Sequence, residues 1–339
     1  MRALVFRGKG QLTVEDVEEP QPAPGEVLVQ VERCGVCGSD LVTYDGRRKV
    51  PLPLVQGHEF VGVIHAIEGK SELPFRPGDR VVAEPTIGCG MCRHCRSGNY
   101  NVCEERKILG AETDGAFAQF VRVPLLNLLR VPEGMPVAEA ALVQPAAVAV
   151  RSVSRGSVPM GASVAVLGAG PIGALIAMVV RAAGAIRVAL VEPNPFRREL
   201  MQSVGFRVID PTQEDPVAAV AAECGEDDGC DVVFDAAGTR DTPAQATRMV
   251  RTQGRVVLVA QYREEPWLDI GHARKREVNF ISIRAHNYED YRAALALIAS
   301  RRVDVRPLVT HELTLDDMPR MFKTLGEGGG PLMKVLCKP

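Results

Sequence analysis

Residues 164–173 read VAVLGAGPIG, a short apolar run that ends in the pattern G-x-G-x-x-G. An apolar stretch with helical spacing follows, so the motif stands between a predicted strand and a predicted helix. In that context the missing glycine side chains let the backbone approach a pyrophosphate, and the helix N-terminus supplies free N–H donors. The stretch therefore predicts a dinucleotide-binding turn. Its residues are Gly168, Gly170, Pro171, Ile172 and Gly173.

The sequence around this turn has the pattern of a parallel sheet covered by helices, because short apolar runs alternate with helical stretches from Gly161 onward. The uncharged stretch 156–180 is long enough to span a bilayer. Its glycines and prolines would interrupt a single helix, and they fit a strand, a turn and a helix. Six strands would complete a doubly wound sheet. They are expected at residues 164–167, 187–191, 207–209, 231–235, 255–259 and 278–283.

The end of the second predicted strand bears on the choice of cofactor. Glu192 stands there, where a carboxylate accepts hydrogen bonds from the adenosine ribose hydroxyls and repels a 2′-phosphate. Arg197 and Arg198 argue in the opposite direction, since a guanidinium is what a 2′-phosphate would bind. As ordinary residues they would be solvated in the first turns of the next helix. The balance favours NAD over NADP.

Length and composition favour a two-domain protein with a small-molecule partner. The chain has 339 residues, of which 46% are hydrophobic and 24% charged, the balance of an ordinary globular protein. The formal net charge is −2 with no block of like charge, so neither a nucleic-acid nor a membrane partner is expected. No secretory signal pattern opens the chain, so we expect a cytoplasmic protein without a disulfide framework.

Four of the nine cysteines lie close together in the pattern C-x2-C-x2-C-x7-C. Thiolates at this spacing can converge on one ion in the tetrahedral geometry of structural zinc. An iron–sulfur cluster is the main alternative, but its bacterial pattern places the fourth cysteine after three residues and before a proline. We therefore predict a structural-zinc lobe at about residues 88–104, with His94 outside the ligand set. The ligands would be Cys89, Cys92, Cys95 and Cys103.

A second cysteine pair, Cys34 and Cys37, could by itself be a redox dithiol. An alternating apolar strand precedes it, however, and His58 and Glu59 follow in the next apolar segment. One cysteine, one histidine and one acid are the mixed ligands of a catalytic zinc, which keeps a coordination position open. A lone histidine is more often structural. The remaining cysteines, Cys224, Cys230 and Cys337, read as small apolar residues.

Taken together, the motifs resemble the zinc-containing medium-chain alcohol dehydrogenase family over nearly the whole chain, and within it the sorbitol and polyol dehydrogenases. The resemblance implies an α/β protein with a GroES-like, β-rich catalytic domain from residues 1–145 and 286–339. A Rossmann domain with a doubly wound parallel sheet would occupy residues 146–285. The motifs are CGVCGSD at 34–40, GHE at 57–59, the four-cysteine lobe, GAGPIG at 168–173 and VDVRPLVTH at 303–311.

The resemblance also implies roles for individual residues. Cys37 and His58 would bind the catalytic zinc, with Glu59 as a third ligand or as one that exchanges with water. Asp40 would orient the ligand histidine. Ser39 would hydrogen-bond the substrate hydroxyl and start its proton toward solvent. The metal content implied is two zinc ions per chain, one catalytic and one structural.

Two departures from the family pattern concern the charge and the proton path of the site. Gln144 stands where polyol dehydrogenases usually have a glutamate; its amide oxygen can still bind zinc, but it brings no charge and accepts no proton. The histidine that often ends the proton relay is also absent, so Glu59, Tyr44 or a water chain would carry the proton. Arg284 resembles a substrate-pocket arginine, or equally a surface residue at the end of a strand.

The expected reaction is reversible oxidation of a secondary hydroxyl to a ketone, with hydride passed to NAD. A polyol, sugar or sugar acid is the first choice of substrate. The alternatives are a primary or aliphatic alcohol dehydrogenase, a threonine-type dehydrogenase, or a non-catalytic nucleotide-binding sensor or structural protein, the last suggested by Gln144 and the missing histidine. The family resemblance implies a homodimer or homotetramer, paired through the predicted edge strand at residues 278–283.

Overall fold

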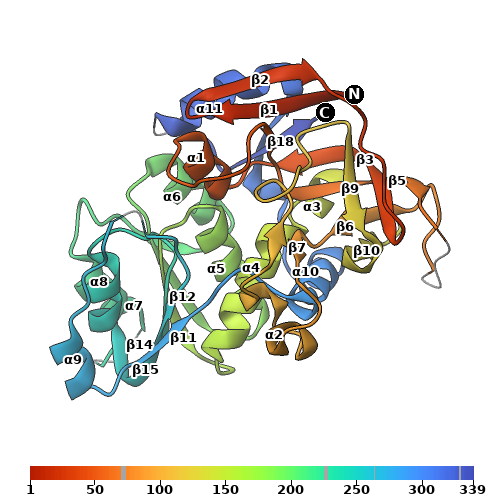
Figure 1. Cartoon of the computed structure of the whole chain (residues 1–339). Helices are drawn as coiled ribbons and strands as arrows, with labels where there is room; N and C mark the ends of the chain where they lie inside the picture. Colours follow the sequence, from red (N-terminus) through yellow and green to blue (C-terminus); the bar gives the residue numbers. More distant parts are fainter. Residues whose placement is uncertain (70–73, 225–227, 263, 328–329) are drawn as a thin grey trace. The chain divides into compact units, whose positions relative to one another are not determined.

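The computed structural model describes residues 1–69, 74–224, 228–262, 264–327 and 330–339. Figure 1 traces the chain in sequence order and labels its elements. The chain divides into two compact units, each with its own sheet. Unit 1 contains Met1–Gln144, Asn287–Ala299 and Leu308–Pro339, and unit 2 contains Pro145–His286 and Ser300–Pro307.

Unit 2 is built on a six-stranded sheet in the order β13-β12-β11-β14-β15-β16, and every neighbouring pair is parallel. The first strand of the unit lies in the middle, so the sheet grows outward in both directions, as a doubly wound sheet does. The predicted sheet and its six strands are confirmed. The strands are β11 (Ser163–Leu167), β12 (Arg187–Val191), β13 (Arg207–Ile209), β14 (Cys230–Asp235), β15 (Val250–Leu258) and β16 (Asn279–Ser282).

Helices connect these strands and pack against them, which explains why the strand sequences are apolar almost throughout. All five residues of β11 are buried, and the chain then turns at Gly168 into helix α5. Pro171 is the first residue of that helix, where its fixed φ and missing N–H cost nothing. The helices are α4 (Val143–Gly156), α5 (Pro171–Ala182), α6 (Pro195–Ser203), α7 (Pro216–Cys224), α8 (Thr242–Met249) and α9 (Ile270–Lys275).

Unit 1 is mostly β structure. Its largest sheet has seven strands in the order β10-β6-β5-β3-β18-β17, with β9 also paired to β3. Two smaller sheets, β2-β1-β4 and β7-β8, complete the β structure of the unit. The strands of all three sheets are β1 (Arg2–Gly8), β2 (Gln11–Asp16), β3 (Glu26–Gly35), β4 (Leu54–Val55), β5 (Glu59–Ile67), β6 (Arg80–Ala83), β7 (Thr86–Ile87), β8 (Lys107–Ile108), β9 (Phe120–Pro124), β10 (Leu128–Arg130), β17 (Val309–Thr314) and β18 (Lys334–Lys338).

The helices of unit 1 are short, apart from those near the C-terminus. They are α1 (Gly38–Tyr44), α2 (Arg93–Arg96), α3 (Val137–Ala140), α10 (Tyr288–Ala299) and α11 (Met318–Gly326), with 3-10 turns at η1 (Tyr100–Val102), η2 (Leu125–Asn127), η3 (Arg306–Leu308, shared with unit 2) and η4 (Leu315–Asp317). The last strand, β18, pairs with β3, so segments far apart in the sequence lie side by side in one sheet. One apolar core fills this unit.

Two cysteines of unit 2 lie close together where α7 ends and β14 begins. Cys224 and Cys230 are buried in the apolar core of unit 2, as expected of small apolar residues, and they also form a disulfide that the sequence did not predict. The end of α7 and the start of β14 bring their Cα atoms to 5.5 Å, a proximity that the short separation in sequence did not reveal.

The uncharged stretch 156–180 is divided into the end of α4, β11 and α5. Within the described ranges, no helix has both the length and the apolar character to cross a bilayer.

Gly173 determines how closely α5 approaches the end of β11. A Cβ atom added there would collide with the carbonyl oxygen of Gly168. We expect Gly173→Ala to lower the free energy of unfolding by about 1–3 kcal/mol, the usual cost of overpacking a core. Urea unfolding followed by circular dichroism measures the change.

Gly170→Ala is the matched control, because a Cβ at that position would meet only a guanidinium nitrogen of Arg197, at an ordinary 3.6 Å. Unfolding of Gly173→Ala at the same urea concentration as the parent would contradict the close-packing interpretation.

Candidate metal and nucleotide sites

Three metal-binding side chains meet in unit 1. The ligand atoms of Cys37, His58 and Glu59 all lie within 4.8 Å of one another. The pairing of β3 with β5 creates this proximity, because Gly35 lies opposite Glu59 and the chain enters α1 directly after Cys37. A thiolate, an imidazole and a carboxylate that can share one ion are a suitable donor set for zinc.

Two glycines allow this approach. A Cβ at Gly35 would lie 2.5 Å from Oε2 of Glu59. Gly57, just before the histidine, has a φ of +96°, and a Cβ there would lie 2.8 Å from the sulfur of Cys34. Gly35 therefore leaves room for the donor Glu59, and Gly57 lets the backbone before His58 pass close to Cys34.

Asp40 and Ser39 lie on either side of the His58 ring. Asp40 is buried, with Oδ1 at 3.5 Å from Nδ1 of His58, and its Oδ2 accepts a hydrogen bond from the backbone N–H of Cys37 at 2.9 Å. The hydroxyl of Ser39 is 3.5 Å from Nε2 of the same ring. Burial opposes protonation of His58, but the negative charges of Asp40 and Cys37 outweigh it and raise the pKa of His58 well above its usual value.

Lys334 is a member of this site that sequence reasoning missed. It lies in β18 with only 2% of its surface exposed, its ammonium pairs with Glu59, and it donates to the carbonyl of Val36 at 2.9 Å. Although burial opposes it, the negative charges of Glu59 and Cys37 raise the pKa of Lys334 above its usual value. A lysine within an otherwise apolar strand was the available signal, since buried lysines are almost always paired.

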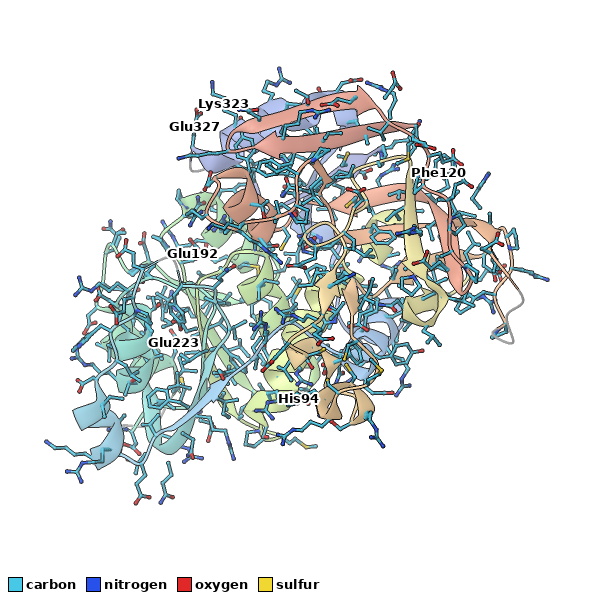
Figure 2. The ribbon with its side chains drawn as sticks, in the orientation of Figure 1. His94, Phe120, Glu192, Glu223, Lys323 and Glu327 are labelled. Atoms are coloured by element: carbon cyan, nitrogen blue, oxygen red, sulfur yellow. A yellow bond between two sulfur atoms is a disulfide. The ribbon has the colours of Figure 1, made fainter. Side chains whose placement is uncertain are left out.

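The four-cysteine lobe forms a second donor cluster in unit 1. The sulfurs of Cys89, Cys92, Cys95 and Cys103 lie within 4.8 Å of one another, and His94 lies on α2 outside this set (Figure 2). Backbone N–H groups of Cys92 and Met91 point at the sulfur of Cys89 and lower its pKa to about 7. Four converging sulfurs with backbone N–H donors fit a closed tetrahedral zinc site.

A buried carboxyl group joins the lobe to the sheet of unit 1. Glu84 follows β6 and is 2% exposed, and its carboxyl accepts a hydrogen bond from the hydroxyl of Tyr100, which belongs to the lobe. Burial and the nearby charge of Asp290 raise the pKa of Glu84 to about 8. The group is therefore largely neutral at pH 7.

The glycine-rich turn of unit 2 is held by Glu192. This buried carboxylate accepts hydrogen bonds from the backbone N–H of Ala169 at 2.7 Å and of Asn194 at 2.9 Å (Figure 2). It thus ties the end of β12 to the turn that follows β11. Arg198 pairs with Asp210 at 2.7 Å. Arg197 lies beside Gly170, and its buried Nε has no hydrogen-bond partner among the described residues.

Comparisons with known proteins identify the family of the chain. Residues 23–133 match the family model of the alcohol dehydrogenase GroES-like domain, and residues 171–300 match that of the zinc-binding dehydrogenases. A sorbitol dehydrogenase from Halalkalibacterium halodurans is 32% identical over 100% of this chain and 99% of its own. The chain belongs to the zinc-binding, medium-chain alcohol dehydrogenase family. The GroES-like and Rossmann-type fold predicted from the sequence is confirmed.

Other members of the family carry further names. An L-threonine 3-dehydrogenase from Pyrococcus horikoshii is 35% identical over 90% of this chain and 88% of its own. A solved structure from Sinorhizobium meliloti, assigned as a zinc-binding dehydrogenase and bound to NADP, has a TM-score of 0.93. It is 29% identical over 100% of this chain and 99% of its own.

The remaining predicted site residues of this dehydrogenase lie as follows. Gln144 is buried at the second position of α4. Tyr44 ends α1, and its ring packs against Phe322 with centroids 5.6 Å apart, so its ring takes part in core packing. Arg284 is exposed and follows β16 in unit 2. Gly168, Pro171, Ile172 and Gly173 form the turn and the first residues of α5.

Removing the ammonium that faces Glu59 should leave an unpaired buried charge in the dehydrogenase. We expect Lys334→Met to lower the free energy of unfolding of chelator-treated protein by about 3–5 kcal/mol. The double variant Lys334→Met/Glu59→Gln removes both charges and should recover part of that loss. Urea unfolding of the parent and the variants, Glu59→Gln included, measures the coupling. A double variant as unstable as Lys334→Met would contradict a direct ion pair.

The raised pKa of Glu84 predicts a pH dependence of stability. The folded state holds its proton up to about pH 8, whereas the unfolded chain releases it near the ordinary value of 4.5. This contribution is complete below the lower value and is lost as the pH rises toward the upper one. Glu84→Gln should therefore flatten the fall in stability across that interval, measured by urea unfolding at a series of pH values. Glu105→Gln, an exposed change on the same lobe, should leave the slope intact.

Proposed function

We propose that this chain is a dehydrogenase that oxidises a secondary hydroxyl of a polyol, sugar or sugar acid to a ketone, with a nicotinamide dinucleotide as the hydride acceptor. The observation that carries the proposal is the cluster of Cys37, His58 and Glu59, whose ligand atoms lie within 4.8 Å of one another. The glycine-rich turn of unit 2 supports it, because a strand–turn–helix of this sequence suits a dinucleotide pyrophosphate.

The side chains around the cluster would divide the work of holding and moving a proton. Asp40 orients His58 through Nδ1, which leaves Nε2 directed toward the metal position. The Oγ of Ser39, at 3.5 Å from Nε2, would accept a hydrogen bond from the substrate hydroxyl and, on taking that proton, release its own to the next acceptor. Glu59 is the acid of the cluster and would pass the proton on, with its charge balanced by Lys334. Tyr44 is less suited to this task, because its ring takes part in core packing.

We assign the catalytic metal to Cys37 and His58, with Glu59 or Gln144 completing the set, and the structural metal to the four-cysteine lobe. When bound, a catalytic zinc would supply Lewis-acid polarisation of the substrate oxygen. The thiolate and the imidazole would fix its position. With an amide at residue 144, the site carries one negative charge fewer than it would with a glutamate.

For the cofactor we propose NAD, with NADP as the second candidate. The buried carboxylate of Glu192 favours NAD, because it stands at the end of β12, where a 2′-phosphate would be repelled. Arg197 favours NADP, because its Nε has no partner among the described residues while it lies beside the turn. The NADP-bound relative from Sinorhizobium meliloti supports the same alternative.

A threonine-type reaction is the second candidate function, supported by the 35% identity to the Pyrococcus horikoshii L-threonine 3-dehydrogenase. We further propose that the division near residues 145 and 286 separates the catalytic domain from the nucleotide-binding domain. The protein would assemble as a homodimer or homotetramer, for which the sheet edge at β16 offers a pairing surface.

Substrate profiling tests the proposed function. Metal-replete protein is incubated with NAD or with NADP and a panel of polyols, sugars, aldonates, simple alcohols and L-threonine, and the reduced cofactor is followed by its absorbance. We expect turnover with at least one polyol, sugar or sugar acid, faster with NAD. Turnover of L-threonine alone would favour the second candidate. A complete lack of cofactor reduction across the panel would refute the dehydrogenase proposal.

Metal analysis of two variants tests the assignment of the ions. Each site should lose its own zinc when one of its sulfurs is removed, because an alcohol side chain is a poor zinc ligand. We expect two zinc ions per parent chain and one in both Cys37→Ser and Cys92→Ser. Only Cys92→Ser should also loosen the lobe, seen as faster backbone hydrogen exchange at residues 88–104. A parent chain with a single zinc, lost in Cys92→Ser alone, would remove the catalytic metal from the proposal.

A further inference from the structure

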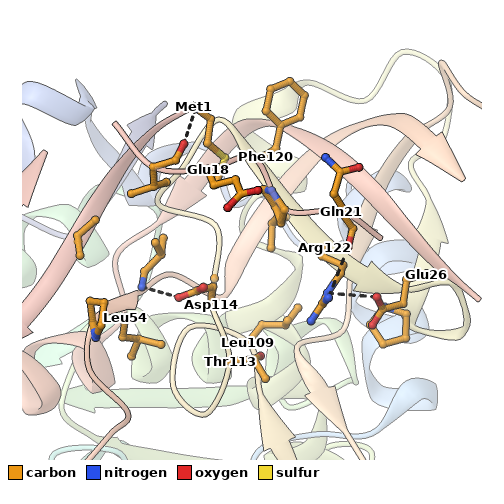
Figure 3. A pocket seen from close by; sticks show the side chains of 18 of the residues that line it. Met1, Glu18, Gln21, Glu26, Leu54, Leu109, Thr113, Asp114, Phe120 and Arg122 are labelled. Atoms are coloured by element: carbon orange, nitrogen blue, oxygen red, sulfur yellow. Dashed lines mark hydrogen bonds and ion pairs between the residues drawn. The ribbon is translucent and has the colours of Figure 1, made fainter. Parts of the chain in front are cut away.

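Unit 1 contains a cavity of about 450 Å³ that the proposed function does not use (Figure 3). Its walls come from β1, the segment between β2 and β3, β4, the loop 109–115 and β9. None of the cysteine, histidine or glutamate residues of the two donor clusters lines it. Its volume lies within the usual range of small-molecule sites.

Part of the cavity wall is apolar and belongs to the packed core of unit 1. Val5, Leu54, Val55, Leu109 and Val121 line it and are each at most 6% exposed, so they belong to the packed core of the unit. Phe120 also belongs to the lining, while its ring packs against that of His65 with centroids 5.2 Å apart. Apolar walls held by a core suit a ligand with an apolar body, because they do not have to rearrange to receive it.

The polar groups of the cavity have spare hydrogen-bond acceptors. Glu18 forms neither an ion pair nor a hydrogen bond with any described residue. Asp114 uses one oxygen to accept the N–H of Val55 at 2.9 Å, which leaves the other oxygen available. The buried Oγ1 of Thr113 also has no partner among the residues that the structure describes.

The charges of the cavity favour a cation. Arg122 is paired with Glu26 at 3.1 Å and donates to the carbonyl of Gln21, so this pair is neutral. The amino group of Met1 donates to the carbonyl of Val17 at 2.7 Å. Against this one positive charge stand the two carboxylates of Glu18 and Asp114, which leaves one net negative charge.

We propose that this cavity is a second ligand site, which binds a small organic cation made of an apolar body and one primary amine. The apolar walls take the body of the ligand. The ammonium would pair with one of the two exposed carboxylates at the cavity rim, Glu18 or Asp114, since an ammonium offers three donors and no acceptor.

One wall of the cavity leads directly to a donor cluster. Leu54 and Val55 precede His58 by only a few residues, and the N–H of Gly115 donates to the carbonyl of Val55 at 2.7 Å. Ala116 and Phe117 donate in the same way to Gly57 and Gln56, each at 2.9 Å. A ligand that stiffens this wall therefore also stiffens the backbone that carries His58.

Calorimetric titration with phenethylamine tests the site in the full, metal-replete chain without nucleotide. Saturating imidazole is present to occupy an open metal position. We expect saturable binding of phenethylamine, weaker binding of the neutral phenylacetamide and none of the anion phenylacetate. Slower backbone hydrogen exchange at residues 54–58 and 113–117 should locate the bound ligand.

The decisive variant is Glu18→Gln/Asp114→Asn, which removes both charges while the new amide oxygen can still accept the N–H of Val55. Its affinity for phenethylamine should fall about tenfold, the cost of losing a charge-assisted hydrogen bond. Glu19→Gln, a neighbouring carboxylate outside the cavity, should bind like the parent. The proposal is overturned if the parent does not bind, if the double variant binds as tightly, if phenylacetamide binds equally well, or if the protection lies elsewhere.

This inference is independent of the proposed dehydrogenase activity. It depends only on residues of unit 1, and its test needs neither turnover nor nucleotide. Binding of phenethylamine in the cavity without any cofactor reduction would support the ligand site and contradict the proposed function. Cofactor reduction without phenethylamine binding would support the proposed function and contradict the ligand site.

Discussion

Buried charge has to be balanced around Glu59, and much of unit 1 is arranged to do so. The carboxylate of Glu59 at the start of β5, the sulfur of Cys37 just before α1 and the buried carboxylate of Asp40 in α1 lie around His58, and an unpaired buried charge is costly. The ammonium of Lys334 supplies one positive charge from the last strand of the chain. A divalent cation bound at the cluster would supply the rest, so the same constraint that places Lys334 in β18 also suits the cluster to a metal ion.

Contacts of backbone with backbone bring the donors to their positions. The glycines at 57, 110 and 115 pack against one another so closely that a Cβ at 110 would lie 2.6 Å from the carbonyl oxygen of Gly57. The same device recurs in unit 2, where Gly173 meets Gly168. In both units, glycine lets a functional turn approach its neighbour without an intervening side chain, which explains why the motifs are rich in glycine.

Both donor clusters are tied to the sheet of unit 1 by buried ionisable groups from distant parts of the chain. Lys334 links the catalytic cluster to the C-terminal strand, and Glu84 links the four-cysteine lobe to β6 through Tyr100. The cavity near β9 is connected to His58 in a simpler way, through backbone hydrogen bonds between residues 115–117 and 55–57. The two donor clusters are therefore coupled to elements that contribute no residue to either cluster.

The sequence alone determined the features that depend on local pattern. The six strands of unit 2 follow from apolar runs, two of them to the residue, and the glycine turn follows from its spacing. Only the tertiary structure decided which distant residues meet. Lys334 meets Glu59, and Glu192 meets the turn of Ala169, through strand pairing. The hydrogen bond from Tyr100 to Glu84 joins the four-cysteine lobe to the residue after β6. The Cys224–Cys230 disulfide likewise required the folded ends of α7 and β14. Periodicity reports which way a side chain faces, but partners separated by many residues are chosen by the packing of the whole unit.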